Sequence, residues 1–124
     1  MLFRSLEEVR RESFLLREPG SGTRTALESC LRESGLSLSD LNVVMELGST
    51  EAIKNAVLAG TGISILSEHA VLPELRACLL WAVSCAGKEM TRQFYLVTHR
   101  HRSQSALCRR FVRFLLEENV RPDS

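Results

Sequence analysis

Apolar and polar residues follow two kinds of pattern along the chain, short apolar runs and helical stripes. The runs at 14–16 and 42–47, bounded by Gly, Pro and Ser, are typical of short strands. After each run, apolar residues recur every three or four positions, as in a helix with one buried face. This alternation predicts an α/β fold with a mostly parallel sheet flanked by helices.

Residues that typically begin or end helices and strands give the limits of the expected elements. Ser5 and Glu8 have capping-box spacing, which predicts a short helix reaching residue 11. Further helices are expected over 23–34, 50–59 and 68–71, and further strands over 63–66, 79–83 and 93–98. Gly35 suits the left-handed end of the first of these helices, and Ser67 suits an N-cap.

The polar faces of two helices lead to more specific expectations. Arg24, Glu28 and Arg32 are expected on the outside of the 23–34 helix, with Glu28 and Arg32 in the favourable order for an ion pair. Lys54 is expected to face water on the 50–59 helix, opposite Ile53.

The last helix, expected over 103–118, has an unusually broad apolar face. Its apolar residues cover an arc of roughly 200° at the ideal helical spacing, and Arg109, Arg110 and Arg113 take the remainder. So wide an arc needs cover on more than one side. The pattern therefore indicates that part of the domain is missing or that a second chain supplies the cover.

Composition narrows the class of protein. A chain of 124 residues suits one domain, and its net charge of +1 favours neither nucleic acid nor an acidic membrane. The sequence shows no secretory segment, no membrane-spanning apolar run and no metal or redox spacing among its four cysteines. A cytoplasmic protein with reduced thiols is expected, without cofactor or membrane partner.

Two strand-to-helix turns are candidates for an anion site. They are 20–23, which contains Ser21, and 48–50, which contains Gly48, Ser49 and Thr50. Unpaired amides and the helix dipole favour an anion at such turns, and ligands of open α/β sheets lie at this edge. The alternative is that Ser49 or Thr50 only caps its helix and that the glycines only permit the turns. Neither turn fits a nucleotide-binding loop.

Catalytic and metal chemistry find no support in the spacing of residues. No nucleophile, base and orienting group can be identified together, so no enzyme is predicted. His99 and His101 are spaced as a metal pair, but Arg100 and Arg102 beside them repel a cation. A solvated turn without metal is expected there.

Three segments carry a family resemblance. In order and spacing, FLLREPGSGTRTALESCL, VVMELGSTEAIKNAVLAGTGISILSEHAV and QFYLVTHRHRSQSALCRRFVRFL resemble the C-terminal half of a LysR-type transcriptional regulator. The resemblance covers about 5–118. It implies a regulatory domain with the fold of a type II periplasmic binding protein, in which an inducer lies between two α/β subdomains. Residues of about 13–75 would form the second subdomain, and about 79–119 the returning part of the first.

The resemblance also implies a function and a site. The family places inducer contacts at the turn that holds Gly48, Ser49 and Thr50, with Gly62 close to that wall and Ser21 in second rank. The chain would be the ligand-sensing and oligomerising part of a bacterial regulator, with a small, anionic metabolite as inducer and a homodimer as its assembly. It lacks the winged helix-turn-helix that contacts DNA and the opening part of the first subdomain, so inducer binding by this chain alone should be weak. The alternative is a solute-binding protein of the same fold.

Overall fold

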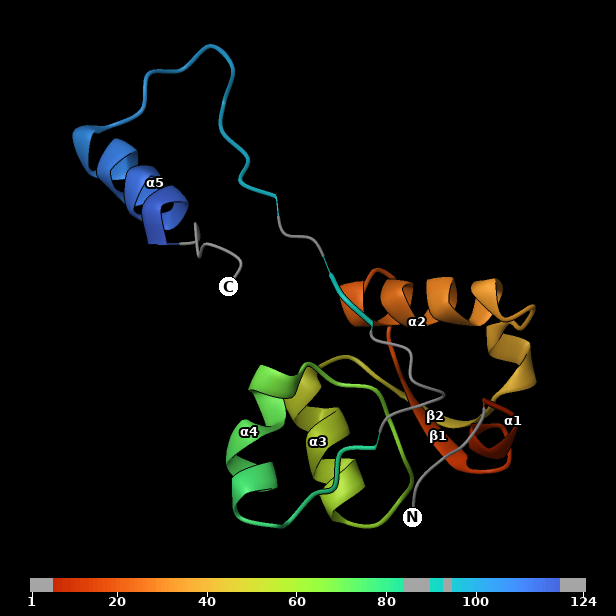
Figure 1. The fold of residues 1–124 in the computed structure, drawn as a ribbon. Coiled ribbons are helices and arrows are strands. Elements are labelled where there is room, and N and C mark those ends of the chain that lie inside the picture. Colours follow the sequence, from red (N-terminus) through yellow and green to blue (C-terminus); the bar gives the residue numbers. More distant parts are fainter. Residues whose placement is uncertain (1–5, 84–89, 93–94, 119–124) are drawn as a thin grey trace, which may run out of the picture. The chain divides into compact units, whose positions relative to one another are not determined.

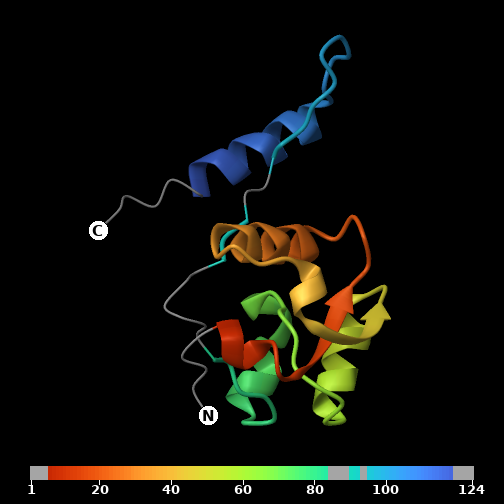
Figure 2. The ribbon, with the colours of Figure 1, turned by 90° about the vertical axis from the view of Figure 1, so that its right-hand side faces the viewer.

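A computed structural model describes residues 6–83, 90–92 and 95–118 of the chain. The chain divides into two compact units, Met1–Gln93 and Phe94–Ser124. The first contains the strands β1 and β2 and the helices α1 to α4, and the second contains α5 (Figures 1 and 2).

The first unit is organised around β1 (Ser13–Arg17), which lies between two neighbours. On one edge it pairs in parallel with β2 (Asn42–Leu47), so that both predicted strands are confirmed. On the other edge the Leu15 amide donates to the Ile63 carbonyl at 2.9 Å, and the Ile63 amide donates to the Ser13 carbonyl at 2.9 Å. The central position explains why apolar side chains on both faces of β1 are buried.

The strand expected over 63–66 is reduced to this one bridge at Ile63. The side chain of Ser64 explains why the strand does not continue. The Ser64 hydroxyl donates to the Leu15 carbonyl at 2.6 Å, and so takes the acceptor that the next rung of a parallel ladder would use.

Helix α2 (Gly22–Glu33) covers one face of β1 and confirms the helix expected over 23–34. Its Leu27 and Leu31 pack with Phe14 and Leu16, and Val9 and Leu41 complete this core. Val9 is the last residue of α1 (Leu6–Val9), and Leu41 directly follows the 3-10 turn η1 (Leu38–Asp40). Burying each leucine contributes about 1.5–3 kcal/mol, so these contacts hold α2 on the sheet.

Helix α3 (Thr50–Leu58), predicted over 50–59, also packs against β1. Leu15 alternates with Phe14 and Leu16 along the strand and therefore points to the opposite face from α2. Leu15 and Ile53 are both fully buried.

The expectation that Lys54 faces water was wrong. Its side chain is only 12% exposed, and its ammonium group lies 3.0 Å from a carboxylate oxygen of Glu51 and 3.0 Å from one of Glu74. The pKa of Lys54 is raised mainly by its hydrogen bond to Glu74 and to a lesser extent by its hydrogen bond to Glu51. In turn, the hydrogen bond from Lys54 lowers the pKa of Glu74. Because Glu74 belongs to α4 (Glu68–Arg76), the pair joins the two helices.

Helix α4 continues past residue 71, where it was expected to end, and includes Pro73. The proline removes one amide donor, but its carbonyl still accepts from the Ala77 amide at 3.0 Å. Ser67 occupies the N-cap position as expected, without a side-chain hydrogen bond to the helix.

The two strands expected over 79–83 and 93–98 are not present in the described residues. Residues 79–83 and 95–98 form irregular chain, and Gln93 and Phe94 lie outside the described part. Trp81 and Val97 are 85% and 84% exposed. β-Branched and aromatic residues form a strand only where a neighbouring strand edge accepts them, and the described residues pair neither segment with one.

The second unit contains α5 (Ala106–Glu118). The helix begins three residues later than expected, because the Ser105 hydroxyl accepts from the Cys108 amide at 3.1 Å and caps it. Along its apolar stripe, Leu107, Phe111, Phe114 and Leu116 are each more than half exposed. The described residues of the second unit therefore leave this stripe uncovered, in line with the breadth of the arc in the sequence.

Helices α2, α3 and α4 end in the same left-handed turn. The residues with positive φ at these three helix ends are Gly35 (72°), Gly60 (78°) and Cys78 (57°). In α4 the Leu79 amide donates to the Glu74 carbonyl and the Cys78 amide to the Leu75 carbonyl, which is the Schellman pattern. Cys78 carries a Cβ where the other two helices have glycine.

Replacing Cys78 by glycine should stabilise the chain. A side chain in the left-handed region costs about 1–2 kcal/mol, and the extra freedom of unfolded glycine offsets part of this. We expect Cys78→Gly to raise the unfolding free energy by about 0.5–1 kcal/mol in chemical denaturation. Ala77→Gly is the control, since Ala77 has φ of −81° and should only lose stability. A lower denaturation midpoint for Cys78→Gly would contradict the strain.

Candidate functional site

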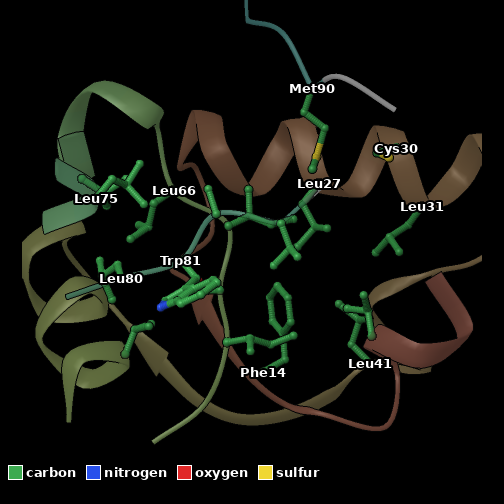
Figure 3. Close-up of a pocket in the computed structure, with 18 residues that line it drawn as sticks. Phe14, Leu27, Cys30, Leu31, Leu41, Leu66, Leu75, Leu80, Trp81 and Met90 are labelled. Carbon is green, nitrogen blue, oxygen red and sulfur yellow. The ribbon is translucent and has the colours of Figure 1, made fainter. Parts of the chain in front are cut away.

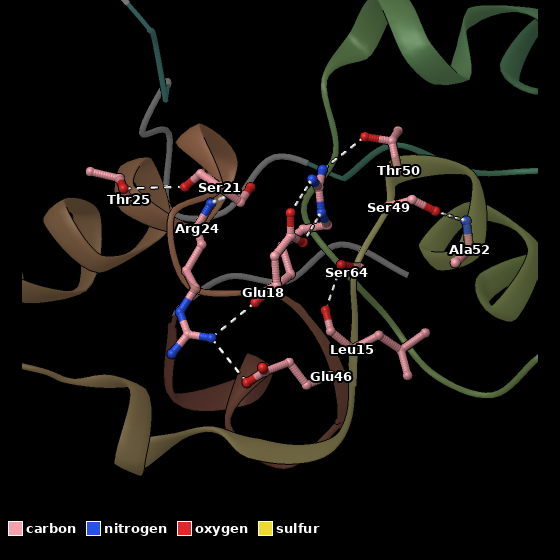
Figure 4. Close-up of polar contacts among 11 residues, drawn as sticks. Leu15, Glu18, Ser21, Arg24, Thr25, Glu46, Ser49, Thr50, Ala52 and Ser64 are labelled. Atoms are coloured by element: carbon pink, nitrogen blue, oxygen red, sulfur yellow. Dashed lines mark hydrogen bonds and ion pairs between the residues drawn. The ribbon is translucent and has the colours of Figure 1, made fainter.

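The two candidate turns lie together at the carboxyl ends of β1 and β2. Arg17 ends β1, Leu47 ends β2, and the two residues are partners in the parallel register. The Glu18 amide donates to the Leu47 carbonyl at 3.2 Å and so links the turns. Figure 4 shows side chains of this edge, among them Glu18, Ser21 and Thr50. Because α2 and α3 begin directly after these turns, two helix N-termini lie at the same edge.

Ser21 and Ser49 are the N-caps of these two helices. The buried Ser21 hydroxyl accepts from the Arg24 amide at 3.4 Å, and the exposed Ser49 hydroxyl accepts from the Ala52 amide at 3.0 Å. Capping was the alternative expected at the second turn, for Ser49 or Thr50, and Ser49 takes this role; capping by Ser21 was not expected from the sequence. A hydroxyl that accepts from its helix still has a hydrogen to donate, so capping is compatible with ligand contact.

The other predicted site residues lie at two different ends of β1. Thr50 accepts from Arg17 Nη1 at 2.8 Å, and Gly48 is exposed, with open space where a Cβ would stand. Gly62 instead lies against Ser13 at the amino end, where a Cβ would overlap the Ser13 carbonyl oxygen. The length of β1, about 13 Å at the usual rise per residue, separates the two ends.

Arg17 is a residue of this edge that the sequence interpretation missed. Its side chain is only 15% exposed, and its Nε and Nη2 donate to the two carboxylate oxygens of Glu18 at 2.8 and 2.9 Å. This bidentate bond is the main reason why the pKa of Glu18 falls to about 2, and it also raises the pKa of Arg17. The signal in the sequence that could have identified it is an arginine directly after the apolar run 14–16.

Arg24 is a second half-buried cation beside the same edge, and its expected place on the outside of α2 was wrong. Its Nη1 donates to the Arg17 carbonyl at 3.0 Å and to Glu46 Oε2 at 3.0 Å, and its Nε donates to Glu28 Oε1 at 3.1 Å. Glu28 thus pairs with Arg24 and not with the expected Arg32. Together, two guanidinium groups meet three carboxylates, so an added anion must displace a carboxylate or bind the helix amides.

The described residues hold no group of three or more His, Cys, Asp or Glu side chains placed to bind a metal ion. His99 and His101 lie in an exposed turn, where the His101 amide donates to His99 Nδ1 at 3.1 Å. Among the helices of the described part, none is both long and apolar enough to cross a membrane.

Removing the Arg17 side chain should raise the pKa of Glu18 toward its ordinary value. The folded-state pKa of Glu18 lies near 2 and its ordinary value is 4.5, so its contribution to stability is complete above 4.5 and is lost as the pH falls toward 2. In Arg17→Met we expect the pKa of Glu18 to rise toward 4.5, as measured by NMR titration of the carboxyl carbon. Arg24→Met is the control and should shift it much less, because Arg24 acts on Glu18 only through its charge. Equal shifts in the two variants would refute the assignment.

Comparison with known proteins identifies the family. Residues 3–120 match the LysR substrate binding domain, so the chain belongs to this family. It is 41% identical over 110 residues to the HTH-type transcriptional regulator CfxR of Cupriavidus necator, covering 86% of this chain and 34% of that protein. It is 35% identical over 117 residues to the HTH-type transcriptional regulator CbbR of Sinorhizobium medicae, covering 94% and 37%.

A solved structure is similar along nearly the whole chain. The regulatory domain of CcmR from Synechocystis PCC6803, in complex with 2-PG, has 28% sequence identity and a TM-score of 0.81. The similarity covers 98% of this chain and 57% of that one. The predicted family and α/β fold are confirmed. Because these relatives are transcriptional regulators, the prediction that the chain is not an enzyme is also confirmed. The chain spans only 34% and 37% of the length of the two regulators.

Proposed function

We propose that this chain is the effector-sensing part of a LysR-type regulator and binds a small anionic metabolite at the carboxyl edge of β1 and β2. The observation that carries the proposal is the meeting of two helix N-termini with the half-buried guanidinium of Arg17. The complex of the similar CcmR domain with 2-PG supports ligand binding by this fold.

The chemistry of Arg17 defines the class of ligand. A guanidinium fork matches the two oxygens of a carboxylate or phosphate group. Glu18 fills that fork with a carboxylate of the protein itself. A ligand carboxylate or phosphate would replace Glu18 on Arg17, while the released Glu18 turns toward water.

The surrounding residues would complete the contacts. We propose that Ser49, Thr50 and Gly48 contact the anion from the start of α3, and that Ser21 contributes from the neighbouring turn. Thr50 already shares Nη1 of Arg17 and would move with it. Gly62, at the other end of β1, is not needed for contact with a small anion.

The regulatory setting is part of the same proposal. A cytoplasmic regulator would couple this site to DNA through a helix-turn-helix segment, as the names of its relatives indicate. The subdomain limits near 13–75 and 79–119 stay a prediction.

Anion binding can be measured by thermal shift with inorganic phosphate and a panel of small carboxylates at millimolar concentration. A ligand that binds only the folded chain raises its melting temperature. We expect Arg17→Met to weaken binding about tenfold or more through loss of a bidentate charged contact. Glu18→Gln should strengthen it, because the competing carboxylate is gone.

The control for this experiment is Arg32→Met, which removes an exposed arginine of α2. Each variant is compared by the midpoint of its ligand titration, so that a change in its own stability does not matter. Equal midpoints for Arg17→Met and Arg32→Met, or weaker binding by Glu18→Gln, would exclude Arg17 as the anion receptor.

We also propose that the chain self-associates through the uncovered stripe of α5. Exposed Phe111 and Phe114 are apolar groups of the kind that association removes from water. Sedimentation should show dimers or larger species at high micromolar concentration, and Phe111→Gln should shift the equilibrium toward monomer. Arg110→Gln, an exposed change on the same helix, should have little effect. A clean monomer of the unaltered chain would contradict the proposal.

A further inference from the structure

The first unit contains an apolar cavity of about 310 Å³ that the anion site does not use. It lies beside the Ile63–Leu66 segment, with α2 along one side and α4 at one end (Figure 3). Arg17, Ser49 and Thr50 are not among the described residues that line it. It is therefore separate from the carboxyl edge of β1 and β2.

The lining excludes a charged ligand. None of the eighteen described lining residues carries a formal charge. The hydroxyl among them, that of Ser64, already donates to the Leu15 carbonyl at 2.6 Å. An ion in this cavity would lose its hydration without gaining a counter-charge, whereas an uncharged apolar molecule would lose little.

The size and the wall residues suit an aromatic molecule. Dry apolar cavities of about 150 Å³ are known to hold benzene, so this cavity has room for one substituted ring or two rings. Figure 3 shows Phe14 and Trp81 among the side chains that converge on the cavity. Aromatic rings favour edge and offset contacts with another ring, and the thioether of Met90 makes favourable contacts with ring edges.

We propose that this cavity binds a small uncharged aromatic molecule between Phe14 and Trp81, independently of the anion at the sheet edge. Phe14 is fully enclosed and forms the floor, whereas Trp81 is 85% exposed and forms the rim. A bound ring would cover the indole of Trp81. Cys30, which is half-buried on α2, lines the same cavity and becomes shielded when the cavity is filled.

Toluene is the probe, and benzoate, the same ring with a carboxylate, is its matched control. Trp81 is the single tryptophan of the chain, so its fluorescence reports on the rim directly. Toluene should raise the melting temperature, shift the Trp81 emission to shorter wavelength and slow alkylation of Cys30 by iodoacetamide at least fivefold. The alkylation rate of the exposed Cys108, followed by mass spectrometry in the same sample, should not change. At equal concentration benzoate should neither shift the Trp81 emission nor slow alkylation of Cys30, and any rise in melting temperature that it causes through the anion site should be lost in Arg17→Met.

Filling the cavity should abolish binding. Val57→Phe places a ring in the space and should weaken toluene binding at least tenfold. If this variant does not fold, the folded chain can be alkylated at Cys30 with N-benzylmaleimide, which occupies the cavity covalently. Alkylated protein should no longer respond to toluene, whereas a Cys30→Ser chain treated in the same way should still respond.

Several results would overturn the proposal. It fails if toluene and benzoate act equally on Trp81 emission and Cys30 alkylation, if fluorescence changes without protection of Cys30, or if the Cys30-alkylated chain still binds toluene. It also fails if toluene affinity falls as protein concentration rises, because a second copy would then occupy the cavity. Arg17→Met should retain toluene binding, so a failure of the anion site and a failure of this cavity can be distinguished.

Discussion

The structure of the first unit depends on the central position of β1 in its sheet. Its backbone bonds to β2 on one edge and to Ile63 on the other, and its three apolar side chains are buried on both faces. Helix α2 can cover one face and α3 the other only because β1 is held in this way. The same pairing brings Arg17 and Leu47 to one edge, and the turns that follow them start both helices there.

Charge at this edge is balanced within the protein. The Arg17 and Arg24 side chains are 15% and 17% exposed, and both are satisfied by carboxylates or carbonyls from β1, the turn after it, α2 and β2. Burying a guanidinium without such partners would cost more than packing could return. If this edge binds an anion as proposed, its cations are already paired with carboxylates of the protein, so binding would exchange one carboxylate for another group. An exchange of this kind can couple ligand binding to movement of Glu18 and Thr50.

Local signals were sufficient for elements that carry their own boundaries. β2 was predicted at its observed limits, and α2 and α3 were predicted to within a residue at either end, because Gly, Ser and apolar periodicity act within a few residues of each other. The prediction of a strand over 63–66 was wrong because the Ser64 hydroxyl donates to the Leu15 carbonyl, which the next backbone hydrogen bond of the sheet would use. No sequence pattern indicates which carbonyl a serine side chain will bind. The 79–83 strand failed because its formation depends on an available sheet edge. Helix α4 was expected to end before Pro73, but the helix continues through it, because the proline removes only one backbone amide donor.

By itself, the sequence determined the α/β order of elements, the family, and the two strand-to-helix turns. These properties depend on residues that are neighbours in the chain. The tertiary structure alone decided that Gly62 lies at the opposite end of β1 from Thr50, that Lys54 joins α3 to α4, and that Arg17 is clamped by Glu18 and Thr50. Such partnerships depend on which strand ends meet in space. That is set by the register of β1 against β2 and Ile63, which no local pattern of the chain specifies.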